Sequence, residues 1–124
     1  MPYDLLLKGA TVVDPSQNLN GKFDVGITDR KISKISHSIP DEVDQIIDVS
    51  GKHLTPGWID LHAHVYAGAT TFGIKADALC LATGVTTIVD AGSPGWTNLR
   101  GFLEYIVEPS RTRVLTFVHI SSIG

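Results

Sequence analysis

The most informative stretch of this chain is Thr55-Pro56-Gly57-Trp58-Ile59-Asp60-Leu61-His62-Ala63-His64-Val65. A Pro-Gly turn leads into an apolar run typical of a β-strand, and two histidines stand two positions apart at its end. Side chains at positions i and i+2 of a strand point to the same face of the sheet. Because Zn²⁺ binds imidazole nitrogens at about 2.0–2.1 Å, both rings can coordinate the same ion. We therefore predict His62 and His64 as metal ligands.

The alternative for this histidine pair is burial in a core without a metal. Burying a polar group without a hydrogen-bond partner costs about 1–3 kcal/mol. Two imidazoles buried on one strand face without a common ligand or hydrogen-bond partners would each carry that cost, so the pattern favours metal ligation. Asp60 is two residues before His62, so in a strand its side chain would lie on the same face as the two histidines. It is either an acceptor for the N–H of a ligand imidazole or an anchor of the local backbone.

Residues 1–55 consist of short runs of alternating apolar and polar residues, separated by turn residues such as Asp14-Pro15 and Asn20-Gly21. Runs of about five residues at this spacing predict an antiparallel sheet or sandwich. One hairpin is expected at residues 28–31, where Arg30 occupies a position at which glycine would most easily supply a positive φ.

Residues 56–124 change to an alternation of strands and helices. This alternation predicts parallel strands joined by right-handed crossovers. A complete (β/α)₈ TIM barrel needs about 250 residues, so this segment holds only its first two to three βα units; a small self-contained α/β domain is the alternative. The expected strands are 58–64, 85–90 and 114–120, and the expected helices are 74–83, ended by Gly84, and a second one capped by Thr97 and ended by Pro109.

Three further residues are candidates for substrate binding, because barrel chemistry lies at the carboxyl ends of the strands. Tyr66 directly follows the histidine pair, Asp90 closes the second expected strand, and His119 lies near the end of the third. The alternatives are a loop tyrosine, an aspartate that bonds its own turn and a histidine that points away from the pocket. Ser93 lacks the pattern of a nucleophile and is expected to be a loop residue.

The composition restricts the partners of this protein. With 43% hydrophobic and 19% charged residues, the chain is expected to be globular. Its net charge is −3 and it has no basic cluster, so the expected partner is a small-molecule substrate rather than nucleic acid or a membrane. The single cysteine, Cys80, is expected to be a small buried hydrophobe. A lone thiol and the lack of an evident export signal predict a cytoplasmic protein.

The sequence resembles the amidohydrolase superfamily of metal-dependent hydrolases. Segments 64–68 and 90–93 resemble its deacetylase-like branch, which is related to D-aminoacylases and often labelled dihydroorotase. True dihydroorotases usually carry an arginine two residues after the second histidine, where this sequence has Tyr66, and this difference counts against dihydroorotase itself. The segments that carry the family resemblance are 5–14, Asp48-Val49-Ser50-Gly51-Lys52, Pro56–His64 and Gly84-Val85-Thr86-Thr87-Ile88-Val89-Asp90.

The resemblance implies an α/β protein in which residues 1–55 are the N-terminal part of a small β-sandwich built from both chain ends. Residues 56–124 would be the first strands and helices of a truncated metal-bearing barrel. One or two ions, Zn²⁺ or another divalent metal, are implied. Of the residues that bind them in the family, only His62 and His64 map onto this chain. A bridging carboxylated lysine or acid, two further histidines and an aspartate that shuttles protons are expected on later strands, so no catalytic residue is assigned here.

The function that the resemblance implies is hydrolysis of amide (non-peptide C–N) or related acyl bonds by metal-activated water, as in deacetylases and aminoacylases. One alternative is hydrolysis of cyclic amides, of the hydantoin or dihydroorotate kind. Another is a non-catalytic scaffold that retains the fold. The 124 residues alone are expected to be inactive, and assembly of the whole protein into a homo-oligomer is left open.

Overall fold

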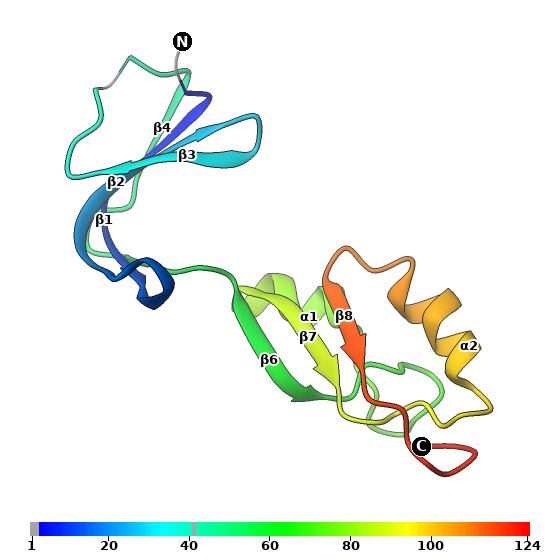
Figure 1. The fold of residues 1–124 in the computed structure, drawn as a ribbon. Helices are drawn as coiled ribbons and strands as arrows, with labels where there is room; N and C mark the ends of the chain where they lie inside the picture. Colours follow the sequence, from blue (N-terminus) through cyan, green and yellow to red (C-terminus); the bar gives the residue numbers. More distant parts are fainter. Residues whose placement is uncertain (1–2, 41) are drawn as a thin grey trace. The chain divides into compact units, whose positions relative to one another are not determined.

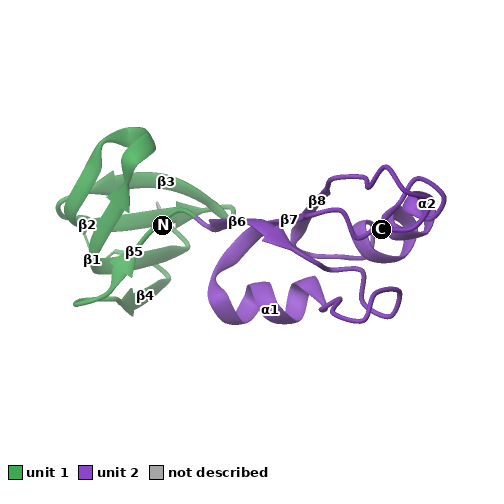
Figure 2. Ribbon diagram, turned by 90° about the horizontal axis from the view of Figure 1, so that it is seen from below, with its two compact units in different colours: residues 1–56 green, residues 57–124 purple. Residues whose placement is uncertain are grey.

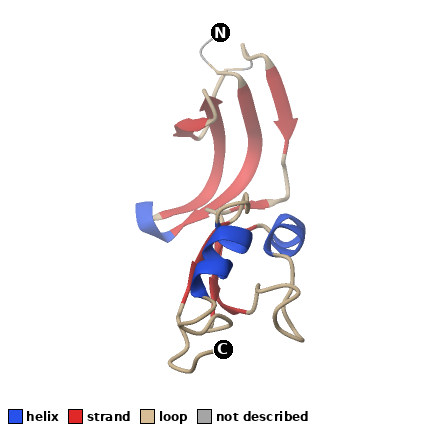
Figure 3. Ribbon diagram, turned by 90° about the vertical axis from the view of Figure 1, so that its right-hand side faces the viewer, coloured by secondary structure: helices blue, strands red, loops and turns tan. Residues whose placement is uncertain are grey.

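The structure is a computed structural model that describes residues 3–40 and 42–124. The chain divides into two compact units, Met1–Pro56 and Gly57–Gly124 (Figure 2). The domain boundary predicted after residue 55 differs from this division by one residue. Each unit has its own sheet, and the longer helical segments belong to the second unit (Figure 3).

The first unit is a five-stranded sheet in the order β3-β2-β1-β4, with β5 pairing a further part of β1. Strands β1, β2 and β3 are antiparallel, as predicted, whereas β4 and β5 run parallel to β1, so the expectation of a wholly antiparallel sheet was wrong. After β3 the chain crosses over, and β4 pairs with the edge of β1 that faces away from β2. A hairpin connection would make paired strands antiparallel, whereas this crossover lets β4 run parallel to β1. The strands are β1 (Leu5–Asp14), β2 (Leu19–Thr28), β3 (Lys31–Ser36), β4 (Gln45–Asp48) and β5 (His53–Leu54).

The hairpin between β2 and β3 has the backbone that the sequence predicted. Asp29 has φ 50° and Arg30 has φ 61°. Two consecutive positive φ values are typical of the type I′ turn, whose twist matches that of paired strands. Arg30 therefore holds a left-handed conformation that glycine would adopt at lower cost.

The second unit is a parallel three-stranded sheet in the order β6-β7-β8, and the three arrowheads in Figure 1 point to the same edge. The predicted order of strands and helices is confirmed at this level. The elements are β6 (Trp58–Ala63), α1 (Ala76–Thr83), β7 (Val85–Asp90), α2 (Leu99–Phe102), the π-helical turn η2 (Leu103–Val107) and β8 (Arg113–Thr116).

Several boundaries in the second unit differ from the prediction. Helix α1 begins two residues late, because the Ile74 N–H donates to the carbonyl of His64 in the preceding loop (2.9 Å). The N-cap of α2 is Asn98, whereas the hydroxyl of Thr97 donates to the carbonyl of Ser122. Strand β8 ends at Thr116 instead of residue 120, since the His119 N–H bonds the carbonyl of Pro94 (2.9 Å), outside the strand ladder.

The core of the second unit lies between the sheet and its helices. Cys80 is 1% exposed, as the sequence predicted for a small apolar side chain. Within the described residues, no helix is long and apolar enough to cross a bilayer. The buried cluster consists of Val65, Ala76, Cys80, Ile88, Phe102 and Val114.

Candidate metal centre

His62 and His64 lie at the carboxyl end of β6. Their ring centroids are 5.7 Å apart, with the ring planes at 74°. His62 lies on β6 and His64 directly follows Ala63, the last residue of the strand, where the structure ends the predicted strand 58–64 one residue early. Ala63 packs against the buried cluster of the second unit, and neither imidazole belongs to that cluster. With Zn–N bonds of about 2.0–2.1 Å, two rings that share one ion have centroids about 5–6 Å apart. The observed separation therefore fits a shared ion.

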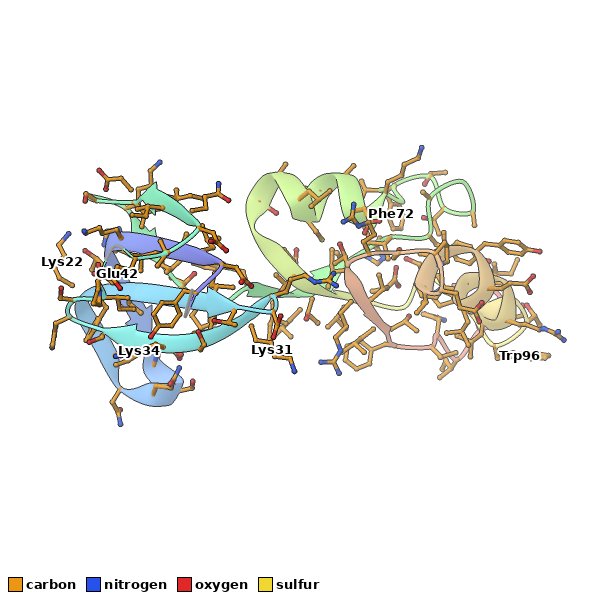
Figure 4. All side chains as sticks on the ribbon, turned by 90° about the horizontal axis from the view of Figure 1, so that it is seen from above. Lys22, Lys31, Lys34, Glu42, Phe72 and Trp96 are labelled. Carbon is orange, nitrogen blue, oxygen red and sulfur yellow. The ribbon has the colours of Figure 1, made fainter. Side chains whose placement is uncertain are left out.

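His64 is held by a second contact that the sequence prediction missed. Its Nδ1 lies 2.9 Å from the hydroxyl oxygen of Ser93, and Ser93 is 2% exposed. This contact occupies Nδ1 and leaves Nε2 for another ligand. The ring of Phe72 also meets His64 edge-on, with centroids 4.7 Å apart. Phe72 is 62% exposed and belongs to the loop between β6 and α1 (Figure 4).

Asp90 connects the end of β6 to the loop after β7. One carboxylate oxygen accepts the N–H of Val65 at 2.7 Å. The other accepts the N–H groups of Gly92 (3.0 Å) and Ser93 (2.6 Å). Gly92 has φ 101°, a left-handed conformation that favours glycine. The side chain of Asp90 is wholly buried, and these bonds give it the turn-forming role that was the alternative to substrate binding.

The remaining candidate residues make their contacts away from the histidine pair. The hydroxyl of Tyr66 donates to the carbonyl of Asn98 (3.3 Å), and its ring packs edge-on against Phe102 in α2. His119 is exposed, and its Nδ1 accepts the N–H of Ser121 (3.0 Å). A substrate-binding role for Tyr66, Asp90 or His119 stays a prediction.

The structure decides between the two roles that the sequence left open for Asp60 and gives Ser93 a contact that the sequence did not predict. Asp60 accepts the backbone N–H of His62 (3.0 Å), which is the local anchoring role, rather than an imidazole N–H. Ser93, expected only as a loop residue, supplies the hydrogen bond to His64. Its position three residues after the aspartate that ends a strand is the one signal in the sequence that could have pointed to it.

The two imidazoles fit part of a metal centre. Neutral imidazole suits Zn²⁺ and other late divalent metals, and catalytic zinc sites generally use three protein ligands. Within residues 3–40 and 42–124, no group of three or more His, Cys, Asp or Glu side chains is placed to hold an ion. His62 and His64 would therefore supply two ligands of a metal site.

The chain has sequence relatives among proteins named deacetylase and dihydroorotase. No family model matches the chain. The chain is 44% identical over 97 residues to "Deacetylase Atu3266" from Agrobacterium fabrum, an alignment that covers 77% of this chain and 24% of that protein. It is 41% identical over 88 residues to a dihydroorotase from Aquifex aeolicus, covering 68% of this chain and 21% of the relative. The chain thus spans about a quarter of the length of these relatives.

Solved structures agree with the sequence relatives. The fold matches a crystal structure of a dihydroorotase with a TM-score of 0.79 and 36% identity, over 97% of this chain and 32% of that one. It matches an adenine deaminase with a TM-score of 0.75 and 28% identity, over 98% and 32% of the two chains. A zinc complex of N-acyl-D-glutamate deacylase from Bordetella bronchiseptica matches with a TM-score of 0.56 and 25% identity, over 75% and 19%. These relatives and neighbours are members of the amidohydrolase superfamily, and the chain is similar to the N-terminal portion of them.

Proposed function

We propose that the protein carrying this chain is a metal-dependent hydrolase of amide or related acyl bonds, with small acyclic N-acyl compounds as substrates. The observation that carries this proposal is the pair of imidazoles at the end of β6, which are 5.7 Å apart and lie outside the buried cluster of the second unit. The 44% identity to a protein named deacetylase supports the substrate class.

We also propose that the two units are parts of larger domains. Unit 1 would be the N-terminal part of a small β-sandwich, and unit 2 would be the first units of a (β/α)₈ barrel. The parallel order β6-β7-β8 supports the barrel. Apolar side chains on the two outer strands support it as well, since further strands and helices would cover them; Leu61 on β6 is 71% exposed and Leu115 on β8 is 44% exposed.

The residues of this chain would act mainly by holding and orienting. His62 and His64 would bind the ion through ring nitrogens, and His64 would use Nε2, because its Nδ1 contacts the Ser93 hydroxyl. A bound divalent ion supplies Lewis acidity, which polarises a carbonyl and lowers the pKa of bound water toward about 7. The exposed ring of Phe72, which touches His64, would limit the space beside the pair. Proton transfer would fall to a residue outside this chain.

Hydrolysis of cyclic amides is the second candidate. The similarity to dihydroorotases favours it, with 41% sequence identity to one relative and 36% sequence identity to a solved structure that matches with a TM-score of 0.79. The position two residues after the second histidine disfavours it, because the hydroxyl of Tyr66 is bonded to Asn98 and offers no cation for a substrate carboxylate. A non-catalytic scaffold is the third candidate, and the intact pair of imidazoles argues against it.

Metal content and turnover test these candidates together. We expect the purified protein to hold one or two Zn²⁺ or other divalent ions, and His62→Ala and His64→Ala to lose metal and activity by a factor of at least about 100. His37→Ala is the matched control, since this exposed histidine stacks on Phe23 in unit 1. Elemental analysis measures the metal, and N-acetyl amino acids are assayed beside hydantoins and dihydroorotate.

Each outcome separates the candidates. Turnover of the acyclic substrates with metal bound supports the proposal, whereas turnover of ring substrates alone supports the second candidate. A folded protein without bound metal or turnover indicates the scaffold. Unchanged metal content in both histidine variants would overturn the assignment of the ligands.

A further inference from the structure

The contact between Ser93 and His64 carries an inference that rests on the proposed metal site. We propose that Ser93 is a positioning residue that sets the tautomer of His64. In this arrangement the Nδ1–H of His64 donates to the Ser93 hydroxyl oxygen across the observed 2.9 Å, and Nε2 keeps its lone pair for the metal.

The direction of this hydrogen bond decides whether His64 can act as a ligand. A neutral imidazole carries one N–H, and only the ring nitrogen without the hydrogen binds a metal. A serine hydroxyl can donate or accept. If the Ser93 hydroxyl donated to Nδ1, the proton would sit on Nε2 and block ligation through that nitrogen. Ligating histidines usually donate their other N–H to an acceptor, which fixes both the tautomer and the ring orientation.

The fold holds Ser93 in place for this contact. Its backbone N–H is fixed at 2.6 Å on one oxygen of Asp90, while the other oxygen holds the N–H of Val65 at 2.7 Å. The same buried carboxylate therefore binds Ser93 and the residue next to His64. A backbone bond from the Ala91 N–H to the carbonyl of Ala63 (2.8 Å) ties the two segments again. These hydrogen bonds hold the backbone of Ser93 beside the segment that carries His64.

A second serine–histidine pair in the same unit provides a comparison. The hydroxyl of Ser121 lies 2.7 Å from Nδ1 of His119, and both residues are exposed. There the backbone N–H of Ser121 also donates to Nδ1 (3.0 Å), so that nitrogen is the acceptor and Nε2 carries the proton. The two pairs are therefore expected to hold opposite tautomers.

Nitrogen NMR of the histidine rings tests the inference in the metal-free protein labelled with ¹⁵N-histidine. We expect His64 to carry its proton on Nδ1 and His119 on Nε2. In Ser93→Ala, His64 should lose the fixed Nδ1–H form, and Zn²⁺ affinity, measured by chelator competition, should fall about 10–100-fold. Ser93→Thr, which keeps the hydroxyl, should restore both. Ser121→Ala is the matched control and should leave the His64 tautomer and the Zn²⁺ affinity unchanged.

A wild-type His64 that carries its proton on Nε2 would overturn the inference, and this measurement needs no variant to fold. Equal tautomers and equal Zn²⁺ affinity in wild type and Ser93→Ala would overturn it as well. A wild type with the Nδ1–H tautomer that binds no Zn²⁺ would instead contradict the proposed function, while the role of Ser93 in setting the tautomer would stand.

Discussion

Asp90 shows how one buried side chain organises the end of two neighbouring strands. Its carboxylate accepts backbone N–H groups from Val65, Gly92 and Ser93 and is closed off from solvent. Charge-assisted hydrogen bonds of this kind are stronger than neutral ones, and they stabilise a carboxylate that burial alone would disfavour. The residue is therefore a structural support of the candidate metal centre.

Replacement of Asp90 should destabilise the protein strongly. In Asp90→Ala, three backbone N–H groups lose their acceptor, and we expect the free energy of unfolding to fall by about 2–4 kcal/mol. Asp90→Asn keeps one carbonyl oxygen and should lose less. Urea unfolding followed by circular dichroism measures the change, with the exposed Asp44 replaced by alanine as control. Equal loss in the Asp90 and Asp44 variants would contradict this role.

At the scale of elements, the sequence predicted the types of the main strands and helices but misplaced several of their ends. Residues 85–90 form β7 as predicted, because a continuous β-branched run indicates a strand buried on both faces. The parallel pairing of β4 with β1 was missed, since β4 is a short run between polar residues, as a hairpin strand can be, and its direction depends on the crossover before it. The end of β8 was misplaced because its apolar run continues into a segment that bonds Pro94 instead of the sheet.

Helix α1 is linked to the start of β8 by Asp77, which gives a pH-dependent contact between elements. The Asp77 carboxylate accepts the backbone N–H of Arg111 (3.1 Å) and of Thr112 (2.8 Å). These bonds, that of Arg111 first, hold the pKa of Asp77 below its ordinary value of 3.8. A lowered folded-state pKa means that the stabilisation is complete above the ordinary value and is lost as the pH falls through the folded-state pKa.

Asp77→Asn should reduce the acid sensitivity of the protein. The variant cannot gain stabilisation from ionisation, so its urea midpoint should lie below that of the wild type at pH 7 and approach it at pH 2–3. Urea unfolding at both pH values measures the difference. A difference between wild type and variant that stays constant across this range would contradict the link through Asp77.

At the scale of the whole molecule, the second unit leaves large apolar side chains uncovered. Leu61 is 71% exposed and Phe117 is 65% exposed, on and directly after the two outer strands of the sheet. Strand edges and apolar faces of this kind promote association. The two relatives are about four to five times as long as the matched segments, and further strands like those of such a chain would cover these side chains.

The 124 residues expressed alone are therefore expected to self-associate and to lack hydrolytic turnover. Two histidines cannot complete a catalytic zinc site, and the uncovered side chains favour aggregation. Light scattering coupled to size-exclusion chromatography measures the mass, and the substrates named above measure turnover. Leu61→Lys should reduce the association without creating activity. A monomer that hydrolyses N-acetyl amino acids would contradict both expectations.

The sequence by itself determined the two-part organisation, the succession of strands and helices in residues 56–124, the burial of Cys80 and the position of two histidines at the carboxyl end of one strand. These features are local, because the period of apolar residues and the turn residues act over a few positions. Only the tertiary structure decided that β4 runs parallel to β1, that Tyr66 packs on α2 and that Ser93 meets His64. The last contact joins residues 29 positions apart, and pairings across such separations depend on how the chain returns to the sheet, which leaves no periodic pattern in the sequence.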